Sequence, residues 1–219
     1  MNNETLIKNL RNVPDFPIPG IQFKDVSTLF KNAKCMRIMV NELYELYKDK
    51  GITKVVGIES RGFVLGAALA VKLNAGFVMC RKPGKLPADT LKETYMKEYG
   101  KDTVEIHKDA ITDKDVVLLH DDLLATGGSM KAAYNLVQKF CPRKTYINFI
   151  IELTGEGLNG RAVSRTDALY LSIEEWRVGQ GRSQALVNLL VGIGNPAGQL
   201  SHGPSFAHER ELVEVVFAV

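Results

Sequence analysis

Hydrophobic and polar residues follow two regular patterns along the first 150 residues of the chain. Four short apolar runs predict strands buried on both faces of a sheet, at 54–58, 76–80, 116–119 and 144–153. Residues 35–47 repeat apolar side chains at helical spacing, and helices are also expected at 64–73 and 130–140. Strands that alternate with helices predict an α/β fold, in which helices flank a parallel twisted sheet with right-handed crossovers.

Two segments interrupt this alternation. Residues 5–13 predict a short helix, and residues 14–25 contain three prolines and a glycine, which exclude regular helix and predict a rigid loop in a small hood. Residues 91–100 and 103–107 predict two strands around a glycine, so a two-stranded lid is expected within 87–107. Mixed charge and exposed polarity in this lid are typical of a mobile cover over a site.

Composition narrows the class of protein. A chain of 219 residues with 45% hydrophobic and 24% charged residues is expected to form one soluble domain with an appendage. Its net charge of +3 is too small to favour nucleic acid or a membrane surface as a partner. The three cysteines are scattered without a Cys-x-x-Cys pair, and neither a signal pattern nor a run of 18 apolar residues occurs. A cytoplasmic location is therefore expected.

The stretch 116–129 combines three features of an anion site. An apolar strand ends at Asp121 and Asp122, and a glycine turn with hydroxyl residues then precedes the helix 130–140. Backbone N–H groups and the dipole at such a helix start favour a phosphate. The two adjacent acids have no cation beside them in the sequence, and sugar hydroxyls, Mg²⁺ or both would relieve their repulsion. The alternative is a solvated strand end with Asp122 as a helix cap.

Two further loops follow predicted strands. Residues 59–63 carry Arg61, whose planar guanidinium suits a pyrophosphate, although a surface ion pair is the plain alternative for one arginine. Residues 81–87 carry three cations on a loop stiffened by proline and glycine, which form either a solvated surface or a second anion clamp. Ligands of open α/β sheets bind at such strand ends.

The run Asp-Asp-Leu-Leu-Ala-Thr-Gly-Gly at 121–128 resembles the signature with which phosphoribosyltransferases bind phosphoribosyl pyrophosphate (PRPP), in the form found in adenine phosphoribosyltransferases. The resemblance implies that Asp121 and Asp122 hold the ribose hydroxyls. It implies that the 5′-phosphate is wrapped by Ala125, Thr126, Gly127, Gly128 and Ser129. Ser129 stands where the family usually has threonine, and His120 replaces an apolar residue and receives no role.

The same resemblance extends over residues 5–161 in five blocks and implies further roles. Pyrophosphate would be bound by Ser60, Arg61, Arg81 and Lys85. Adenine would be bound by Gln22, Phe23 and Lys24, with Phe23 stacking on the base. The lid would contribute Tyr95, Glu98 and Tyr99. Glu98 is the implied acid–base residue, and Arg61 is the second implied catalytic residue. The Ser60–Arg61 peptide is expected to be cis. Arg81 is expected to reach the neighbouring subunit's active site, which implies a homodimer.

The resemblance implies purine salvage, in which adenine and PRPP give AMP and pyrophosphate. Mg²⁺ would be held mainly by PRPP and water, without an assigned protein ligand. Two alternatives remain: a phosphoribosyltransferase for another nucleobase, and a regulator that senses PRPP without turnover. No helix-turn-helix or basic face supports the regulator. We expect a phosphoribosyltransferase domain over 1–176, including the hood and the lid, and a C-terminal extension of unknown role over 177–219.

Overall fold

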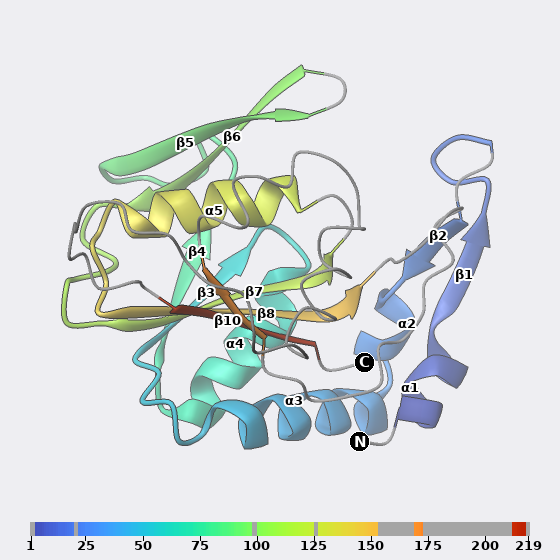
Figure 1. The fold of residues 1–219 in the computed structure, drawn as a ribbon. Coiled ribbons are helices and arrows are strands. Elements are labelled where there is room, and N and C mark those ends of the chain that lie inside the picture. Colours follow the sequence, from blue (N-terminus) through green and yellow to red (C-terminus); the bar gives the residue numbers. More distant parts are fainter. Residues whose placement is uncertain are drawn as a thin grey trace, which may run out of the picture.

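A six-stranded sheet forms the centre of the molecule (Figure 1). The structure is a computed structural model that describes residues 3–19, 22–97, 100–124, 127–152, 169–172 and 212–217. The strand order is β4-β3-β7-β8-β10-β9. The bounds are β3 Lys54–Ile58, β4 Gly76–Cys80, β7 Val116–Leu124, β8 Lys144–Glu152, β9 Leu169–Ser172 and β10 Leu212–Phe217. All neighbours pair in parallel except β10 and β9, so the predicted parallel α/β sheet is confirmed.

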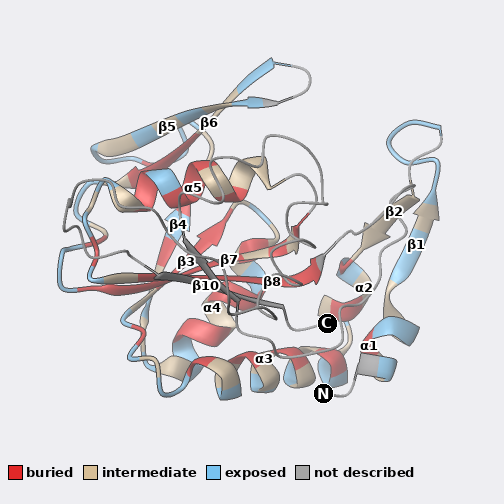
Figure 2. Cartoon of the chain, in the orientation of Figure 1, coloured by how far each residue is buried: buried red, intermediate tan, exposed pale blue. Residues whose placement is uncertain are grey.

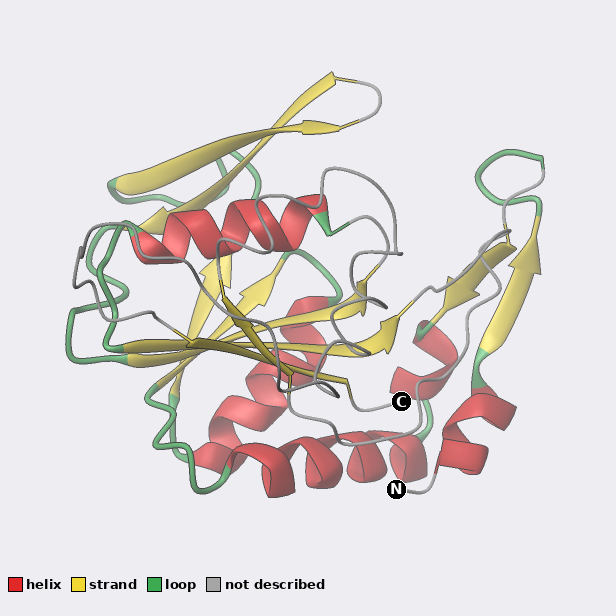
Figure 3. Cartoon of the chain, in the orientation of Figure 1, coloured by secondary structure: helices red, strands yellow, loops and turns green. Residues whose placement is uncertain are grey.

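Helices cover both faces of this sheet, as Figures 1 and 3 show. On one face lie α3 (Ala33–Tyr47) and α4 (Gly62–Leu73), and on the other lies α5 (Gly128–Gln138). The α3 helix begins at Asn32, whose side chain accepts hydrogen bonds from two backbone N–H groups of the first turn. Its buried residues recur every four positions, at Cys35, Met39, Leu43 and Tyr47, which is the core-facing side that the apolar spacing predicts.

Most residues of the central strands are buried (Figure 2). One apolar cluster joins α5 to the sheet and another joins α3 and α4 to its opposite face. The predicted bounds of β3 and β4 are confirmed, because continuous apolar runs mark strands covered on both sides. Among the described residues, no helix has both the length and the apolar character that a bilayer crossing requires.

The N-terminal hood differs from its prediction. Helix α1 (Asn3–Asn9) ends early, and β1 (Arg11–Pro14) then pairs with β2 (Gln22–Asp25) in an antiparallel hairpin. The short helix α2 (Ser27–Phe30) follows. The helix expected over 5–13 was therefore too long, and the loop expected over 14–25 contains a strand. Cross-strand pairing, including an ion pair between Arg11 and Asp25, decides this region, and helical spacing along one segment does not reveal it.

The two strands predicted in the lid segment are confirmed as an antiparallel pair, β5 (Thr90–Lys97) and β6 (Gly100–His107). It stands beside α5 in Figure 1, and Glu105 of β6 exchanges backbone hydrogen bonds with Arg81 after β4. Within the expected extension, residues 212–217 form β10 between β8 and β9. Residues 173–211 and 218–219 lie outside the described residues.

Candidate active site

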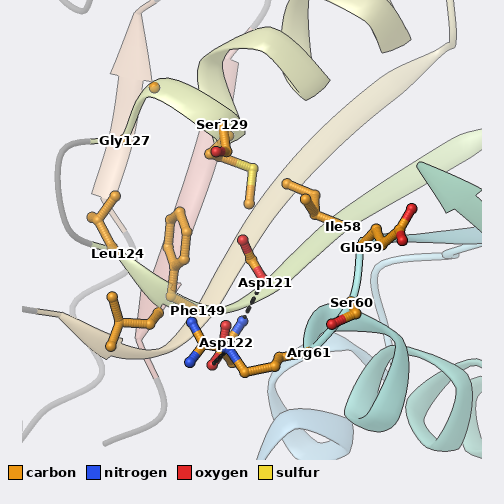
Figure 4. Close-up of a pocket in the computed structure, with 13 residues that line it drawn as sticks. Ile58, Glu59, Ser60, Arg61, Asp121, Asp122, Leu124, Gly127, Ser129 and Phe149 are labelled. Carbon is orange, nitrogen blue, oxygen red and sulfur yellow. Dashed lines mark hydrogen bonds and ion pairs between the residues drawn. The ribbon is translucent and has the colours of Figure 1, made fainter. Parts of the chain in front are cut away.

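A cavity of about 230 Å³ lies where β3 and β7 end and α4 and α5 begin (Figure 4). The register pairs Gly57 with His120, so the two strands reach the cavity at the same level. The cavity is lined by Ile58, Glu59, Ser60, Arg61, Asp121, Asp122, Leu123, Leu124, Gly127, Gly128, Ser129, Met130 and Phe149. The carboxyl ends of adjacent parallel strands thus carry the polar groups, as in other ligand sites of open α/β sheets.

Strand β7 points its two acids in opposite directions. The strand runs on to Leu124, beyond its predicted end at residue 119, so Asp121 and Asp122 lie inside it and alternate between its faces. Figure 4 shows Asp121 directed toward Ser129 and Asp122 directed toward Arg61. Arg61 Nε lies 2.9 Å from Asp122 Oδ2, and the Asp122 side chain is only 2% exposed. Asp122 therefore has a cationic partner that is distant in the sequence.

The two acids also differ electrostatically. Burial and the neighbouring charge of Asp122 raise the pKa of Asp121 well above its usual value. Burial raises the pKa of Asp122 as well, while Arg61 opposes the shift. Asp121 Oδ1 accepts a hydrogen bond from the Asp122 backbone N–H at 2.9 Å. Donors from a ligand would stabilise the charged form of Asp121, and ribose hydroxyls are such donors.

Two glycines allow the backbone to close around the acids. A Cβ on Gly62, the first residue of α4, would lie 2.7 Å from the carbonyl oxygen of His120 and 3.2 Å from Asp121 Oδ1. Gly127 precedes α5 with φ 75°, in the left-handed region that glycine adopts without penalty. Helix α5 therefore starts beside the cavity with its first N–H groups available to an anion. Ala125 and Thr126 lie outside the described residues.

The loop after β3 differs from its prediction in one respect. The non-proline cis peptide joins Glu59 to Ser60, so the cis bond expected between Ser60 and Arg61 was placed one residue too late. Ser60 and Arg61 both line the cavity. The Arg61 guanidinium carbon lies 5.6 Å from the ring centre of Phe23, so the same arginine contacts the hood and Asp122.

Glu59, which the sequence analysis did not select, connects the two cationic loops. Its carboxylate accepts from Arg81 Nε at 3.2 Å and from the Lys82 backbone N–H at 3.0 Å, and it forms an ion pair with Lys85. Burial alone would raise the pKa of Glu59, but these donors lower it to about 2. The only sequence signal was an acid directly after a buried strand, because its partners lie more than twenty residues away.

The hood brings one of three predicted adenine-binding residues to this site. Phe23 contacts Arg61 and also packs edge-to-face on Phe16, with ring centres 5.1 Å apart. Gln22 and Lys24 alternate with Phe23 along β2 and so face the other way. The Gln22 side-chain oxygen accepts a hydrogen bond from Asn12 across the hairpin at 2.6 Å.

The lid contacts the start of α5 through Tyr95. The Tyr95 hydroxyl lies 3.0 Å from Ser129 Oγ and donates to Asp102 Oδ2 at 3.1 Å. Asp102 in turn forms an ion pair with Lys82. Glu98 and Tyr99, the other predicted lid residues, lie outside the described residues.

His120 occupies the interior of the sheet. It is fully buried, and its Nδ1 lies 2.6 Å from Asn148 Oδ1 on the neighbouring strand β8. Burial lowers the pKa of His120 to about 4, although the bond to Asn148 opposes the shift. This neutral pair lies directly beneath the acids and fixes the relative position of β7 and β8. It does not line the cavity.

Comparison with known proteins agrees with this geometry. The family model of the phosphoribosyl transferase domain matches residues 25–169. The adenine phosphoribosyltransferase of Phocaeicola vulgatus is 68% identical over 161 residues, covering 74% of this chain and 91% of the relative.

Solved structures give the same result. The crystal structure of adenine phosphoribosyltransferase from Rhodothermus marinus is 52% identical with TM-score 0.65, covering 69% of this chain and 86% of that one. The enzyme from Saccharomyces cerevisiae, complexed with an imino-altritol bisphosphate and adenine, is 41% identical with TM-score 0.65, covering 68% of this chain and 88% of that one. With a domain match across most of its length and this degree of identity, the chain belongs to the adenine phosphoribosyltransferase family.

Proposed function

We propose that this protein transfers the phosphoribosyl group of PRPP to adenine and releases AMP and pyrophosphate. The observation that supports this most directly is the cavity at the ends of β3 and β7. It is lined both by a carboxylate at the end of β7 and by the start of α5, which follows a glycine. A polyol beside a phosphate fits these two features together. Positioning and electrostatic stabilisation would supply most of the rate enhancement.

In this proposal each edge of the cavity binds one part of PRPP. Asp121 accepts hydrogen bonds from the ribose hydroxyls, and Asp122 supports them while it orients Arg61. The 5′-phosphate lies at the start of α5, against the backbone of Gly127 and Gly128 and the Ser129 hydroxyl, with Ala125 and Thr126 completing the loop. Pyrophosphate binds to the cationic side of the cavity, at Ser60, Arg61, Arg81 and Lys85.

Adenine would enter between the hood and the ribose. Phe23 stacks on the base, while Gln22 and Lys24 belong to the strand that carries it. N9 of adenine attacks the anomeric carbon as the bond to pyrophosphate breaks, and the bonding electrons leave with pyrophosphate. Glu98 receives the proton of N9, and the lid with Tyr95 and Tyr99 excludes water from the oxocarbenium-like transition state.

Mg²⁺ is the cofactor that this substrate implies. Among the described residues, no group of three or more His, Cys, Asp or Glu side chains is arranged to hold a metal ion. Asp121 fits a cation nearby, because burial and a neighbouring acid disfavour its charged form. We therefore assign the ion mainly to oxygens of PRPP and water. When bound, it neutralises part of the negative charge of the leaving group.

We further propose that the enzyme is a cytoplasmic homodimer. Arg81 pairs with Glu59 of its own chain in this structure, and its expected reach into the partner's site stays a prediction. Val64 and Val71 on α4 and Met79 on the edge strand β4 are 41%, 84% and 42% exposed, which provides apolar surface for a second copy. Cys35, Cys80 and Cys141 are free thiols, which suits a reducing compartment. Sedimentation would test the dimer, and a monomeric mass in the active enzyme would contradict it.

One assay tests the proposed reaction against its alternatives. Protein, Mg²⁺ and PRPP are incubated with each nucleobase in turn, and pyrophosphate release is followed. Release with adenine alone supports the proposal, and release with another base changes the acceptor. If PRPP binds but no base gives release, the protein is a PRPP sensor. We also propose that the phosphoribosyltransferase domain extends to residue 176. Truncation there would remove β10 from the central sheet, so the same assay on the truncated protein tests whether 177–219 are dispensable.

A further inference from the structure

The Glu59 carboxylate accepts hydrogen bonds from more groups than the other described acids at the cavity, and all of these donors come from one loop. Arg81 offers Nε at 3.2 Å and Nη2 at 3.5 Å, Lys82 offers its backbone N–H at 3.0 Å, and Lys85 adds its ammonium group. The Glu59 side chain is 11% exposed, and it borders both the main cavity and a smaller one beside it. Figure 4 shows its carboxylate turned away from Asp121.

This donor set is the one that a phosphate group would also use. A guanidinium, an ammonium and a backbone N–H form strong charge-assisted bonds with any compact anion. While Arg81 and Lys85 are bound to Glu59, they offer only part of their donors to a ligand. A diphosphate carries several negative charges and would take these cations from a single carboxylate.

We propose that Glu59 competes with pyrophosphate for Arg81 and Lys85, holding their loop at the cavity in the free protein and limiting the affinity for the leaving group. This inference rests on the proposed function. Glu59 is then a positioning residue that weakens product binding and so speeds pyrophosphate release. A purely structural anchor would have the opposite effect, because its removal would displace the loop and weaken anion binding.

The charge of Glu59 is constant over the working range of the enzyme. Its pKa of about 2 keeps the carboxylate ionised at every pH where the protein would be assayed. The groups that face it are Arg81, Lys82 and Lys85. Competition with pyrophosphate is therefore set by geometry and by ligand concentration, and no protonation step is needed.

The test is Glu59→Gln, which retains an oxygen for the Lys82 N–H and removes the charge. The dissociation constant of pyrophosphate, measured by calorimetry, should fall about ten-fold, as expected for removing one like charge beside an anion. Both kcat and the KM for PRPP should fall because release becomes slow, and adenine affinity should not change. Unchanged or weaker pyrophosphate binding would overturn the proposal.

Two controls separate this effect from others. Asp89→Asn removes the same charge from a nearby exposed acid that pairs with Lys108, and it should leave pyrophosphate affinity unaltered. If the glutamine variant does not fold, Glu59→Asp retains the charge on a shorter side chain and should bind pyrophosphate about three-fold tighter than wild type. No gain there would also overturn the proposal. Failure of the proposed function is distinguishable, because wild-type protein would then bind neither pyrophosphate nor PRPP.

Discussion

Glu59 at the end of β3 and Asp121 at the end of β7 line the same cavity, yet their surroundings shift their pKa values in opposite directions. Glu59 after β3 receives two cations and a backbone N–H from its own chain, and its pKa is lowered to about 2. Asp121 on β7 is buried next to the charge of Asp122, and its pKa is raised. The position at a strand end is shared, so the difference comes from the donors that later segments of the chain supply.

This difference separates two kinds of acid in one site. The protein satisfies Glu59 before any ligand arrives, and that carboxylate stabilises the fold around the cations. Asp121 accepts a hydrogen bond from the Asp122 backbone N–H, and in the proposed function ligand hydroxyls supply its further donors. In the proposed function the ribose hydroxyls bind at Asp121, whose pKa is raised, and the anion binds at the cations around Glu59, whose pKa is lowered.

Replacing Asp121 should produce the largest effect. Asp121→Asn removes a poorly solvated charge, so the free energy of unfolding should rise by about 1 kcal/mol while kcat/KM falls by roughly 10³-fold. Urea unfolding and initial rates would measure both. Asp122→Asn is the matched control and should alter stability less, because Arg61 already offsets part of the burial cost there. A less stable Asp121→Asn variant would break the comparison.

A third acid, Glu98, is proposed to transfer a proton and not to bind PRPP, and its substitution tests this. Glu98→Gln should lower kcat by roughly 10²-fold, because the amide cannot accept the N9 proton, and PRPP affinity should change little. Single-turnover rates and PRPP titration would measure this. An unaltered rate would remove Glu98 from the mechanism, and its assignment comes from the family resemblance alone.

The signature residues of the site were predictable from the sequence because their spacing is local. Residues 121–129 are contiguous in the sequence, from the last residues of β7 to the first turn of α5, so their order along the chain already groups them. Glu59 and Arg61 were harder, because their partners Arg81, Lys85 and Asp122 come from other segments. Only the folded sheet shows which loop satisfies which acid.

The same reasoning explains which elements of the fold were missed. Strands β3 and β4 are continuous apolar runs, and their predicted bounds match the structure to the residue. Strand β7 continues through Asp121 and Asp122, although the sequence pattern predicted that the strand ends before these two acids. The hood hairpin depends on pairing between β1 and β2. The β-branched run of β10 was a usable signal that lay beyond the region of family resemblance.

The opposite pKa shifts predict opposite effects of acid on stability. Glu59 has a lowered pKa, so its contribution is complete above the ordinary value of 4.5 and is lost as the pH falls toward about 2. Asp121 has a raised pKa, so its penalty is present at neutral pH and is relieved as the pH falls through that raised value. The Glu59 contribution should amount to about 1–2 kcal/mol after solvent screening.

Urea midpoints measured from pH 7 to pH 3 would separate the two acids. Asp121→Asn should remove the gain in stability on mild acidification, and Glu59→Gln should remove part of the loss below pH 4.5. Equal acid dependence of the two variants would show that their surroundings do not differ as proposed.

The smallest expected effect concerns the contact between the lid and the phosphate loop. Tyr95→Phe removes the hydroxyl that joins Asp102 on β6 to Ser129 on α5. Without it the lid loses a tie to the start of α5, so the KM for PRPP should rise about three-fold for one hydrogen bond, with adenine affinity unchanged.

A neighbouring residue provides the control for that prediction. Thr94→Val removes a hydroxyl one position earlier on β5, where it bonds Thr103 on the exposed side of the lid, and it should not alter the KM. In a Ser129→Ala background, Tyr95→Phe should add nothing, because the partner of its hydroxyl is already gone. If the two substitutions instead raise the KM for PRPP additively, the Tyr95 hydroxyl acts only within the lid. The phosphate loop would then be held from the β7 side of the cavity.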